Sequence, residues 1–242
     1  MYIYKYYPLF EGEEESDKRL VLLENKLLWM SRYEYLNDPT EYAYFIRGNT
    51  IFDKMCADVG DILIASFSRR FNGLPMWAHY ANNHRGFVVE FKTNSSKNNN
   101  LYKVKYIKKP LKISEIGQSR DKNCDNIRDK YEKIFLGQDE KNIIETFYNG
   151  AVISSKVKLE ICRIKHDDWK YENEYRLIIP AGMNFLDDNV ISFNYAKIQP
   201  THIYAGMKCS LKNIRKLEKL SRIWAIGEPK QIMIEDFYIN NS

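Results

Sequence analysis

The chain has 242 residues, of which 44% are hydrophobic and 29% charged, with a formal net charge of +5. This length and apolar content suffice for one sizeable core, so we expect a single domain over residues 1–242. The sequence lacks an apolar run long enough to cross a bilayer and a secretory signal at its start. Its four cysteines have neither zinc-ligand nor disulfide spacing. We therefore expect a cytoplasmic protein without membrane contact or a bound metal.

The first half of the chain carries separate strand and helix patterns. β-Forming residues precede Pro8 in the opening strand, and leucines recur at helical spacing before residue 30. PMWAHYANNHRG places proline in the first turn of a helix and glycine at its end. In chain order, the predicted elements are a strand at 2–7, a helix at 18–30, a turn at 37–41, a strand at 62–68, a helix at 75–86 and a strand at 87–91.

The second half mixes strands and helices without a regular alternation of the two. Such a mixture predicts the α+β class, here with mostly antiparallel mixed sheets flanked by helices. In chain order, we expect a surface loop at 94–100, a strand at 101–107, a helix at 125–148, strands at 169–179 and 202–206, a helix capped by Ser210, and a strand at 231–239.

Lysines are concentrated between Lys92 and Lys122 and are interleaved with Tyr102 and Tyr106. Lysines neutralise phosphates and aromatic rings stack on bases, so this segment could bind a nucleic acid. The alternative is a solvated face that keeps the protein monomeric. The candidate nucleic-acid-binding residues are Lys103, Lys105, Lys108 and Lys109.

The stretch WKYENEYRLII, residues 169–179, reads as a strand with charges at every second position. Side chains alternate across a strand, so Lys170, Glu172, Glu174 and Arg176 are expected on one face. The two glutamates are either a catalytic pair or part of a charge ladder that Lys170 and Arg176 satisfy.

Two further polar clusters stand in apolar surroundings. SFS ends the strand that reaches Ser68, and MWAHY places His79 beside Trp77 and Tyr80. Each has an ordinary explanation as a strand-end cap or a core aromatic group. The histidine spacing does not fit a metal site, and the glycine motifs of nucleotide-binding loops and of serine hydrolases are missing.

Five strings occur in an order that resembles a bacterial family catalogued as domain of unknown function 2971. They are YKY near the start, NDPTE, SFS followed by MWAHYANNHRGFVVEF, KHDDWKYENEYRLI, and IYAG. They extend from Tyr4 to Gly206. This resemblance implies membership of the family but no function.

The order of elements ending in E-x-E is similar to that of ADP-ribosyltransferases. That resemblance implies that Lys5 holds NAD and that Ser66 and Ser68 support the nicotinamide site. Glu174 would stabilise the ribosyl oxocarbenium ion, and Glu172 would orient or deprotonate the acceptor.

His79 and Tyr80 would line the same pocket, with Tyr80 stacked on nicotinamide. The sequence departs from the pattern because Lys5 replaces an arginine or histidine and SFS replaces S-T-S.

The resemblance to ADP-ribosyltransferases therefore implies an enzyme of that type that uses NAD as a substrate. It could be a toxin or phage-defence effector that modifies a nucleic acid or a protein. One alternative is a nucleic-acid-binding or nucleolytic module. Another is a non-catalytic regulatory or interaction domain with an unknown protein partner.

Overall fold

A computed structural model of the chain describes residues 1–10, 12, 14–38, 41, 45–46, 50–60, 62–94, 100–112, 116, 129–130, 133, 143–180 and 189–238. The fold is α+β, as predicted, with a mixed and mostly antiparallel main sheet. Contacts within the chain define two compact units. Unit 1 comprises Met1–Ser31, Leu63–Lys103 and Trp169–Ser242, and unit 2 comprises Arg32–Ile62 and Val104–Asp168. That the whole chain is one folding domain stays a prediction.

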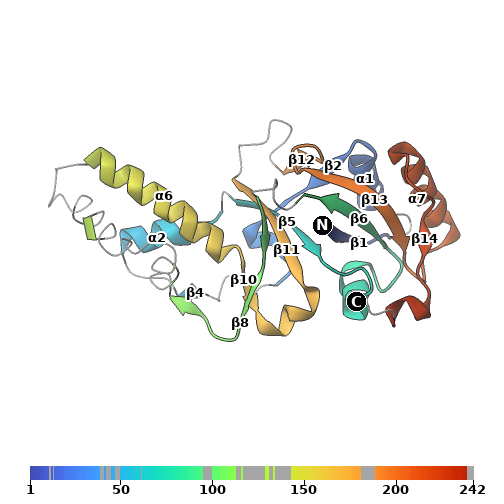
Figure 1. Ribbon diagram of the computed structural model, residues 1–242, viewed down its shortest axis with the longest axis horizontal. Helices are drawn as coiled ribbons and strands as arrows, with labels where there is room; N and C mark the ends of the chain where they lie inside the picture. Colours follow the sequence, from blue (N-terminus) through green and yellow to red (C-terminus); the bar gives the residue numbers. More distant parts are fainter. Residues whose placement is uncertain are drawn as a thin grey trace. The chain divides into compact units, whose positions relative to one another are not determined.

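The sheet of unit 1 is built around the opening strand (Figure 1). The central strands β6, β1 and β5 are antiparallel neighbours, and Tyr4 lies opposite both Glu90 and Ser68. Along the sheet the order is β14 (Lys230–Gln231), β13 (Ile198–Ala205), β6 (Phe87–Thr93), β1 (Tyr2–Tyr7), β5 (Ile62–Ser68), β11 (Glu174–Pro180) and β7 (Leu101–Lys103). The predicted strands at 2–7, 62–68, 87–91 and 202–206 are confirmed within these elements, except for Gly206, which follows β13.

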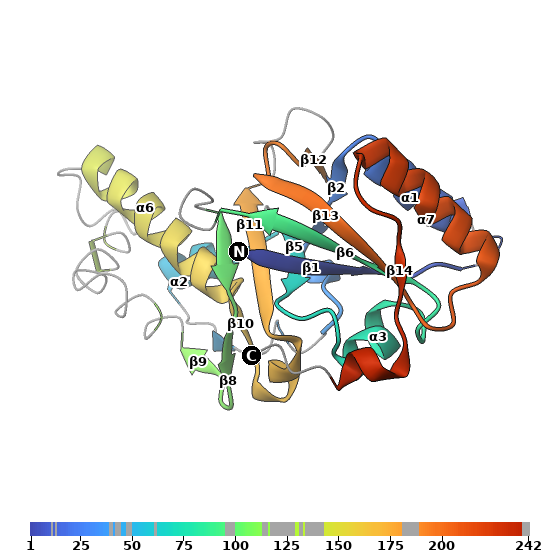
Figure 2. The same cartoon turned by 45° about the vertical axis from the view of Figure 1, so that its right-hand side comes forward.

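Alternation along β1 divides the core of unit 1 between the two faces of the sheet. Ile3 and Tyr7 belong to the larger hydrophobic cluster, which α1 (Glu14–Glu24) and α7 (Leu211–Trp224) share. Tyr4 and Tyr6 pack on the opposite face against Met76, Trp77 and other apolar residues, where α3 (Leu74–Tyr80) lies. Figure 2 shows α1 and α7 side by side and α3 apart from them. Each face thus has its own helical cover.

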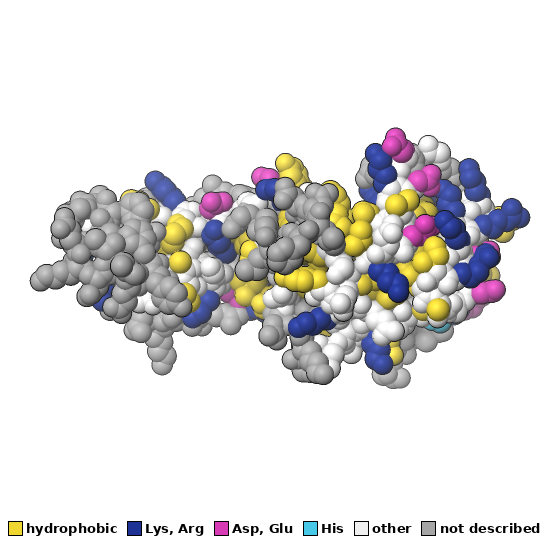
Figure 3. All heavy atoms as spheres, turned by 90° about the horizontal axis from the view of Figure 1, so that it is seen from above, with side chains coloured by type: hydrophobic (Ala, Val, Ile, Leu, Met, Phe, Trp, Pro, Cys, Tyr) yellow, Lys and Arg dark blue, Asp and Glu magenta, His cyan; other side chains and the backbone are white. Residues whose placement is uncertain are grey.

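The predicted helix after Ser210 is confirmed as α7, and its cap is the expected one. The Ser210 hydroxyl accepts a hydrogen bond from the Asn213 amide. The basic side of α7 meets acidic residues of α1 through the pairs Lys216–Asp17 and Lys219–Glu24. Figure 3 shows Lys and Arg side chains interspersed with Asp and Glu at the end of unit 1 that carries α7.

The predicted helix over residues 18–30 is wrong in its second half. α1 ends at Glu24, and Lys26 adopts a left-handed conformation with φ of 56°. The chain then forms β2 (Leu27–Trp29), which pairs with β12 (Val190–Ser192) from far along the sequence. Leu27 and Leu28 continue the helical spacing of the preceding leucines but lie in a strand. The strand with which they pair is remote in the sequence, so local periodicity cannot reveal it.

Three other boundaries differ from the predictions. The helix predicted over 75–86 ends at Tyr80, because residues 82–84 all have positive φ. The strand predicted over 101–107 is divided at Val104 into β7 and β8 (Lys105–Ile107). The strand predicted over 231–239 is wrong: β14 ends at Gln231 and the 3-10 helix η4 (Ile234–Phe237) follows. Residue 239 lies outside the described residues.

The 3-10 helix η4 exists because Asp236 caps it. The Asp236 carboxylate accepts hydrogen bonds from the Met233 amide at 2.8 Å and from the Lys230 ammonium at 2.7 Å. Both contacts hold the pKa of Asp236 below its usual value. Asp236, which stands in the apolar stretch predicted as a strand, therefore caps a helical turn and does not lie on a strand face.

Within the described residues of unit 2, short strands accompany the helices α2 (Ile51–Ala57) and α6 (Ile143–Ile161). α2 and α6 contact one another, and β8 pairs with β10 in parallel. Lys165 and Glu41, both buried, form an ion pair at 3.6 Å. The elements are η1 (Tyr33–Tyr35), β4 (Phe45–Ile46), α2 (Ile51–Ala57), β8, β9 (Leu111–Lys112), α6 (Ile143–Ile161) and β10 (Ile164–His166).

Some predictions fall largely on residues that the structure does not describe. They are the turn at 37–41 (at Pro39 and Thr40), the loop at 94–100 (at 95–99), and most of the helix predicted at 125–148. Its last residues, 143–148, do belong to α6, which continues to Ile161. Among the described residues, none of the helices combines the length and apolarity that a membrane span requires.

Candidate functional site

The WKYENEY stretch is not one continuous strand. Trp169 and Glu172 belong to the 3-10 helix η3 (Asp167–Glu172), and β11 begins only at Glu174. Asn173 between them has a positive φ of 46°, a conformation that asparagine tolerates better than most residues. The predicted common strand face is therefore wrong for Lys170 and Glu172, which lie in η3, but Glu174 and Arg176 do share a face of β11.

Glu172 is buried and bound through both its side chain and its backbone. The Tyr80 hydroxyl donates a hydrogen bond of 2.5 Å to its Oε1, and the Ser68 hydroxyl donates one of 2.7 Å to its backbone oxygen. Ser68 Oγ also accepts a hydrogen bond from the Arg70 amide at 3.0 Å. The end of β5 and the end of α3 thus meet at Glu172, the first at its backbone oxygen and the second at its carboxylate, which brings the predicted clusters together.

Glu174 has a different partner. The Arg176 guanidinium donates to Oε1 of Glu174 at 2.8 Å through Nε and to Oε2 at 3.2 Å. Glu174 and Arg176 are 4% and 1% exposed, so the pair is almost completely removed from water. The charge-pair alternative is therefore confirmed for Arg176, and both oxygens of Glu174 are engaged.

Aromatic side chains lie beside Glu172. The exposed His79 ring is 6.3 Å from the Tyr80 ring and 6.5 Å from the Tyr171 ring. Tyr171 is 39% exposed, so this aromatic group reaches the surface of unit 1. We call Ser68, His79, Tyr80, Tyr171 and Glu172 the Tyr80–Glu172 site. The sequence predicted all of them as site residues except Tyr171.

Lys5 lies on the other face of the sheet. Lys5 is two residues from both Ile3 and Tyr7 along β1, so it shares their face, which carries the larger core cluster. On β5, Phe67 belongs to that cluster, so its neighbours Ser66 and Ser68 point to the opposite face. The Lys5 ammonium donates to the Ser66 backbone oxygen at 3.2 Å and lies 5.4 Å from the centre of the Phe67 ring. The structure therefore separates Lys5 from the serine side chains with which it was expected to converge; that Lys5 and Ser66 bind NAD stays a prediction.

The environment of Lys5 lowers the pKa of its ammonium group. Burial lowers the pKa of its ammonium from the ordinary 10.5 to about 8, and the charge of Arg19 adds to this effect. The Glu174 carboxylate acts in the opposite direction and raises the pKa, but its effect is smaller than that of burial.

The predicted nucleic-acid-binding lysines are not equivalent. Lys103, Lys108 and Lys109 are exposed. Lys105 is also exposed but forms an ion pair of 2.6 Å with the buried Glu160. Lys103 belongs to unit 1, and the other three lysines belong to unit 2.

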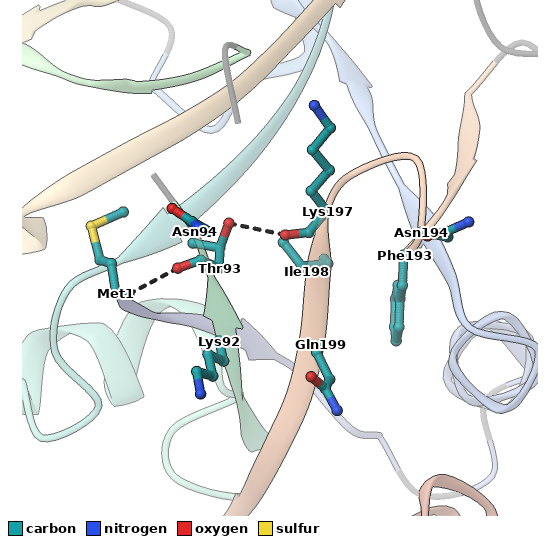
Figure 4. Close-up of a pocket in the computed structure, with 9 residues that line it drawn as sticks. All are labelled: Met1, Lys92, Thr93, Asn94, Phe193, Asn194, Lys197, Ile198 and Gln199. Carbon is teal, nitrogen blue, oxygen red and sulfur yellow. Dashed lines mark hydrogen bonds between the residues drawn. The ribbon is translucent and has the colours of Figure 1, made fainter. Parts of the chain in front are cut away.

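A depression of about 550 Å³ lies at the end of β6, where Met1, Thr93 and Lys197 meet (Figure 4). The Met1 amino group donates to the Thr93 oxygen at 2.8 Å, and the Thr93 hydroxyl donates to the Lys197 oxygen at 3.0 Å. In Figure 4, the side chains of Lys92 and Lys197 point away from one another. The Met1 amino group and the Thr93 hydroxyl are thus engaged within the wall, and the two lysine side chains do not converge on one point. Nor do the described residues contain a cluster of potential metal ligands.

Comparison with known proteins gives a family but no activity. Neither the curated proteins nor the solved structures contain a match to this chain. Residues 76–177 match the family described as "Protein of unknown function (DUF2971)". The matched segment includes α3, with His79 and Tyr80, and the Glu172 and Glu174 carboxylates. The family resemblance expected from the sequence is therefore supported over residues 76–177.

Proposed function

We propose that the Tyr80–Glu172 site transfers ADP-ribose from NAD to a nucleophilic acceptor. The observation that supports this is a buried carboxylate, Glu172, that is held by a tyrosine hydroxyl beside surface-reaching aromatic rings. A fixed carboxylate stabilises positive charge better in a water-poor site than in solvent. Aromatic rings offer a flat surface on which a nicotinamide ring can stack.

The two glutamates have unequal roles in this proposal. Arg176 already compensates the charge of Glu174 through two hydrogen bonds. The Tyr80 hydroxyl donates to Oε1 of Glu172, and a hydroxyl that holds a carboxylate oxygen also fixes its direction toward a developing cation. We therefore assign the essential role to Glu172, whereas the E-x-E resemblance implies Glu174. Glu174 and Arg176 would position β11 beside β5.

The reaction would proceed through an oxocarbenium ion. The bond between ribose C1′ and the nicotinamide nitrogen breaks, and its electron pair leaves with nicotinamide. The Glu172 carboxylate stabilises the cation at C1′ and then accepts the proton of the acceptor, whose oxygen or nitrogen forms the new bond to C1′. Because Glu172 is 2% exposed, Tyr80 must turn aside so that the ribose can approach.

Nicotinamide release from NAD by the purified full chain tests the proposal. Glu172→Gln should lower the release rate at least about 100-fold, the usual cost of removing one group that stabilises a transition-state charge. Glu218→Gln on α7 is the matched control and should retain full activity. Far-ultraviolet circular dichroism of each variant checks that it is folded.

The result of Glu174→Gln assigns the roles. Loss in Glu172→Gln with substantial activity in a folded Glu174→Gln supports the assignment. Full activity in Glu172→Gln overturns the role given to Glu172. No nicotinamide release by the unmodified chain overturns the proposal and favours a non-catalytic regulatory or interaction domain.

A second candidate function is binding of a nucleic acid, which the exposure of Lys108 and Lys109 in unit 2 favours. Exposed lysines bind phosphates with an affinity that falls as salt concentration rises. We expect replacement of these lysines by glutamine to weaken binding of a fluorescent oligonucleotide and to flatten its salt dependence. Lys105→Gln is the comparison, because Lys105 is already paired with Glu160. Binding that ignores both salt and the substitutions would exclude this function.

A further inference from the structure

A cavity of about 870 Å³ lies in unit 1 on the face of β1 opposite the Tyr80–Glu172 site. Its walls come from β1, α1 and the β2–β12 pair, and its volume is within the range of small-molecule sites. We infer that this cavity binds a small organic carboxylate with an apolar body, whose charged end meets Lys5 and Tyr7. None of its lining residues belongs to the Tyr80–Glu172 site, so the two proposals are independent.

The apolar part of the wall comes from three elements. Val21 and Leu22 belong to α1, Trp29 to β2 and Val190 to β12. Val21 and Trp29 are 53% and 50% exposed, an unusual degree of exposure for large apolar side chains that share one hollow. A ligand with an apolar body would cover both.

The polar part of the wall contains donors. Tyr7 is 8% exposed, and its hydroxyl is buried without a hydrogen-bond partner among the described residues. Its ring stacks on Phe87 at 5.0 Å, which fixes the position of the hydroxyl. A buried hydroxyl without a partner is unfavourable, so a ligand oxygen that accepts from it would remove that cost.

Lys5 supplies the positive charge. Of the three donors of its ammonium, the described residues engage one, through the Ser66 oxygen at 3.2 Å. The ammonium also lies 5.8 Å from the centre of the Tyr7 ring, so the two groups are neighbours in the wall. Lys18 and Arg19 line the same cavity and add two further cations.

The charges at the cavity favour a singly charged anion. Its two carboxylates, Glu14 and Asp17, form ion pairs with Lys18 and Lys216. They do not neutralise Lys5, but they would repel a phosphate dianion more strongly than a carboxylate. The mostly aliphatic and aromatic lining disfavours a small inorganic ion. A carboxylate with an apolar body satisfies both parts of the wall.

Matched probe pairs test this inference by isothermal titration and ligand-observed NMR on the full chain. The pairs are indole-3-acetate with indole-3-acetamide, and hexanoate with hexanamide. At least one carboxylate should bind at pH 7, its amide should bind at least about tenfold more weakly, and inorganic phosphate should not compete. Absence of binding by both carboxylates, or equal binding of acid and amide, would overturn the inference.

Three variants locate the site. Lys5→Met removes the charge but keeps the side-chain length and should weaken carboxylate binding about tenfold or more. Tyr7→Phe should weaken it about threefold to tenfold and yet raise the melting temperature of the free protein, because it removes an unpaired buried hydroxyl. Tyr204→Phe alters a tyrosine on the opposite face and should leave binding unchanged. Carboxylate binding that survives Lys5→Met undiminished contradicts the inference, and binding undiminished in Tyr7→Phe removes Tyr7 from the site.

Discussion

Arg176 and Glu174 lie two residues apart on β11 and form a bidentate ion pair inside unit 1. Arg176, at 1% exposure, is among the largest fully buried side chains of the described residues. An ion pair this deep in the fold loses the hydration of both charges, so each partner depends on the other. The E-x-E-Y-R string is therefore in part a structural motif, in which the arginine and the second glutamate form a unit.

Arg176→Met should destabilise the protein by about 3–5 kcal/mol, because it leaves the Glu174 carboxylate buried beside an apolar chain. The measurement is the free energy of unfolding from urea titration. The double variant Glu174→Gln with Arg176→Met should recover part of that loss, since it removes both charges. A loss below about 1 kcal/mol in Arg176→Met would contradict the picture of a mutually dependent pair.

The stability contribution of Lys5 should rise with pH between about 8 and 10.5. Burial lowers the pKa of Lys5 in the folded protein to about 8, whereas the unfolded chain keeps the ordinary value of 10.5. Between these values the unfolded state binds more protons than the folded state, so deprotonation favours folding. Below pH 8 both states hold the proton, and the burial cost is fully present.

Urea unfolding of the protein and of Lys5→Met at pH 7, 8, 9 and 10 tests this expectation. The stability of the protein relative to Lys5→Met should increase as pH rises across that series. Comparison with the variant cancels the titration of other lysines and tyrosines. A difference that stays constant from pH 7 to pH 10 would mean that folded Lys5 remains protonated throughout.

Gly86→Ala should destabilise the fold by about 1–3 kcal/mol or more. A β-carbon at Gly86 would lie 2.1 Å from the Tyr7 backbone oxygen and 3.1 Å from the Ala81 Cα, and backbone atoms have little room to move. Thermal unfolding measures the effect. Gly227→Ala is the matched control: a β-carbon there meets nothing within 4 Å, so its effect should stay within about 0.5 kcal/mol. Equal stability of the two variants would contradict the close approach at Gly86.

Elements with their own local signals were predictable. The opening strand before Pro8, the apolar strand ending at Ser68 and the Ser210 cap each carry a signal within a few neighbouring residues. Residues 169–172 were wrongly predicted as a strand, because the alternating pattern of charges runs through them into β11 without a break. In the structure, Asn173 has a left-handed backbone conformation that separates the 3-10 helix η3 from β11. One backbone angle thus decides whether Glu172 shares a face with Glu174.

The candidate site was predictable in its residues but not in its pairings. The sequence alone identified Ser68, Tyr80 and Glu172 as polar groups in apolar surroundings. Buried polar groups need hydrogen-bond partners, so each of the three was expected to have one. Which partner each one has depends on segments about a hundred residues apart, such as Tyr80 and Glu172. Local patterns carry no information on such distant contacts.

The sequence by itself determined the α+β class, the main strands, the α7 helix and the family resemblance, because these follow from periodicity, capping and motif order. Only the tertiary structure decided which face of the sheet each charge occupies. It set Lys5 above the larger core beside a cavity, paired Glu174 with Arg176, and gave Glu172 to Tyr80. Face and partner are set by strand register and backbone reversals, which arise from contacts between distant segments.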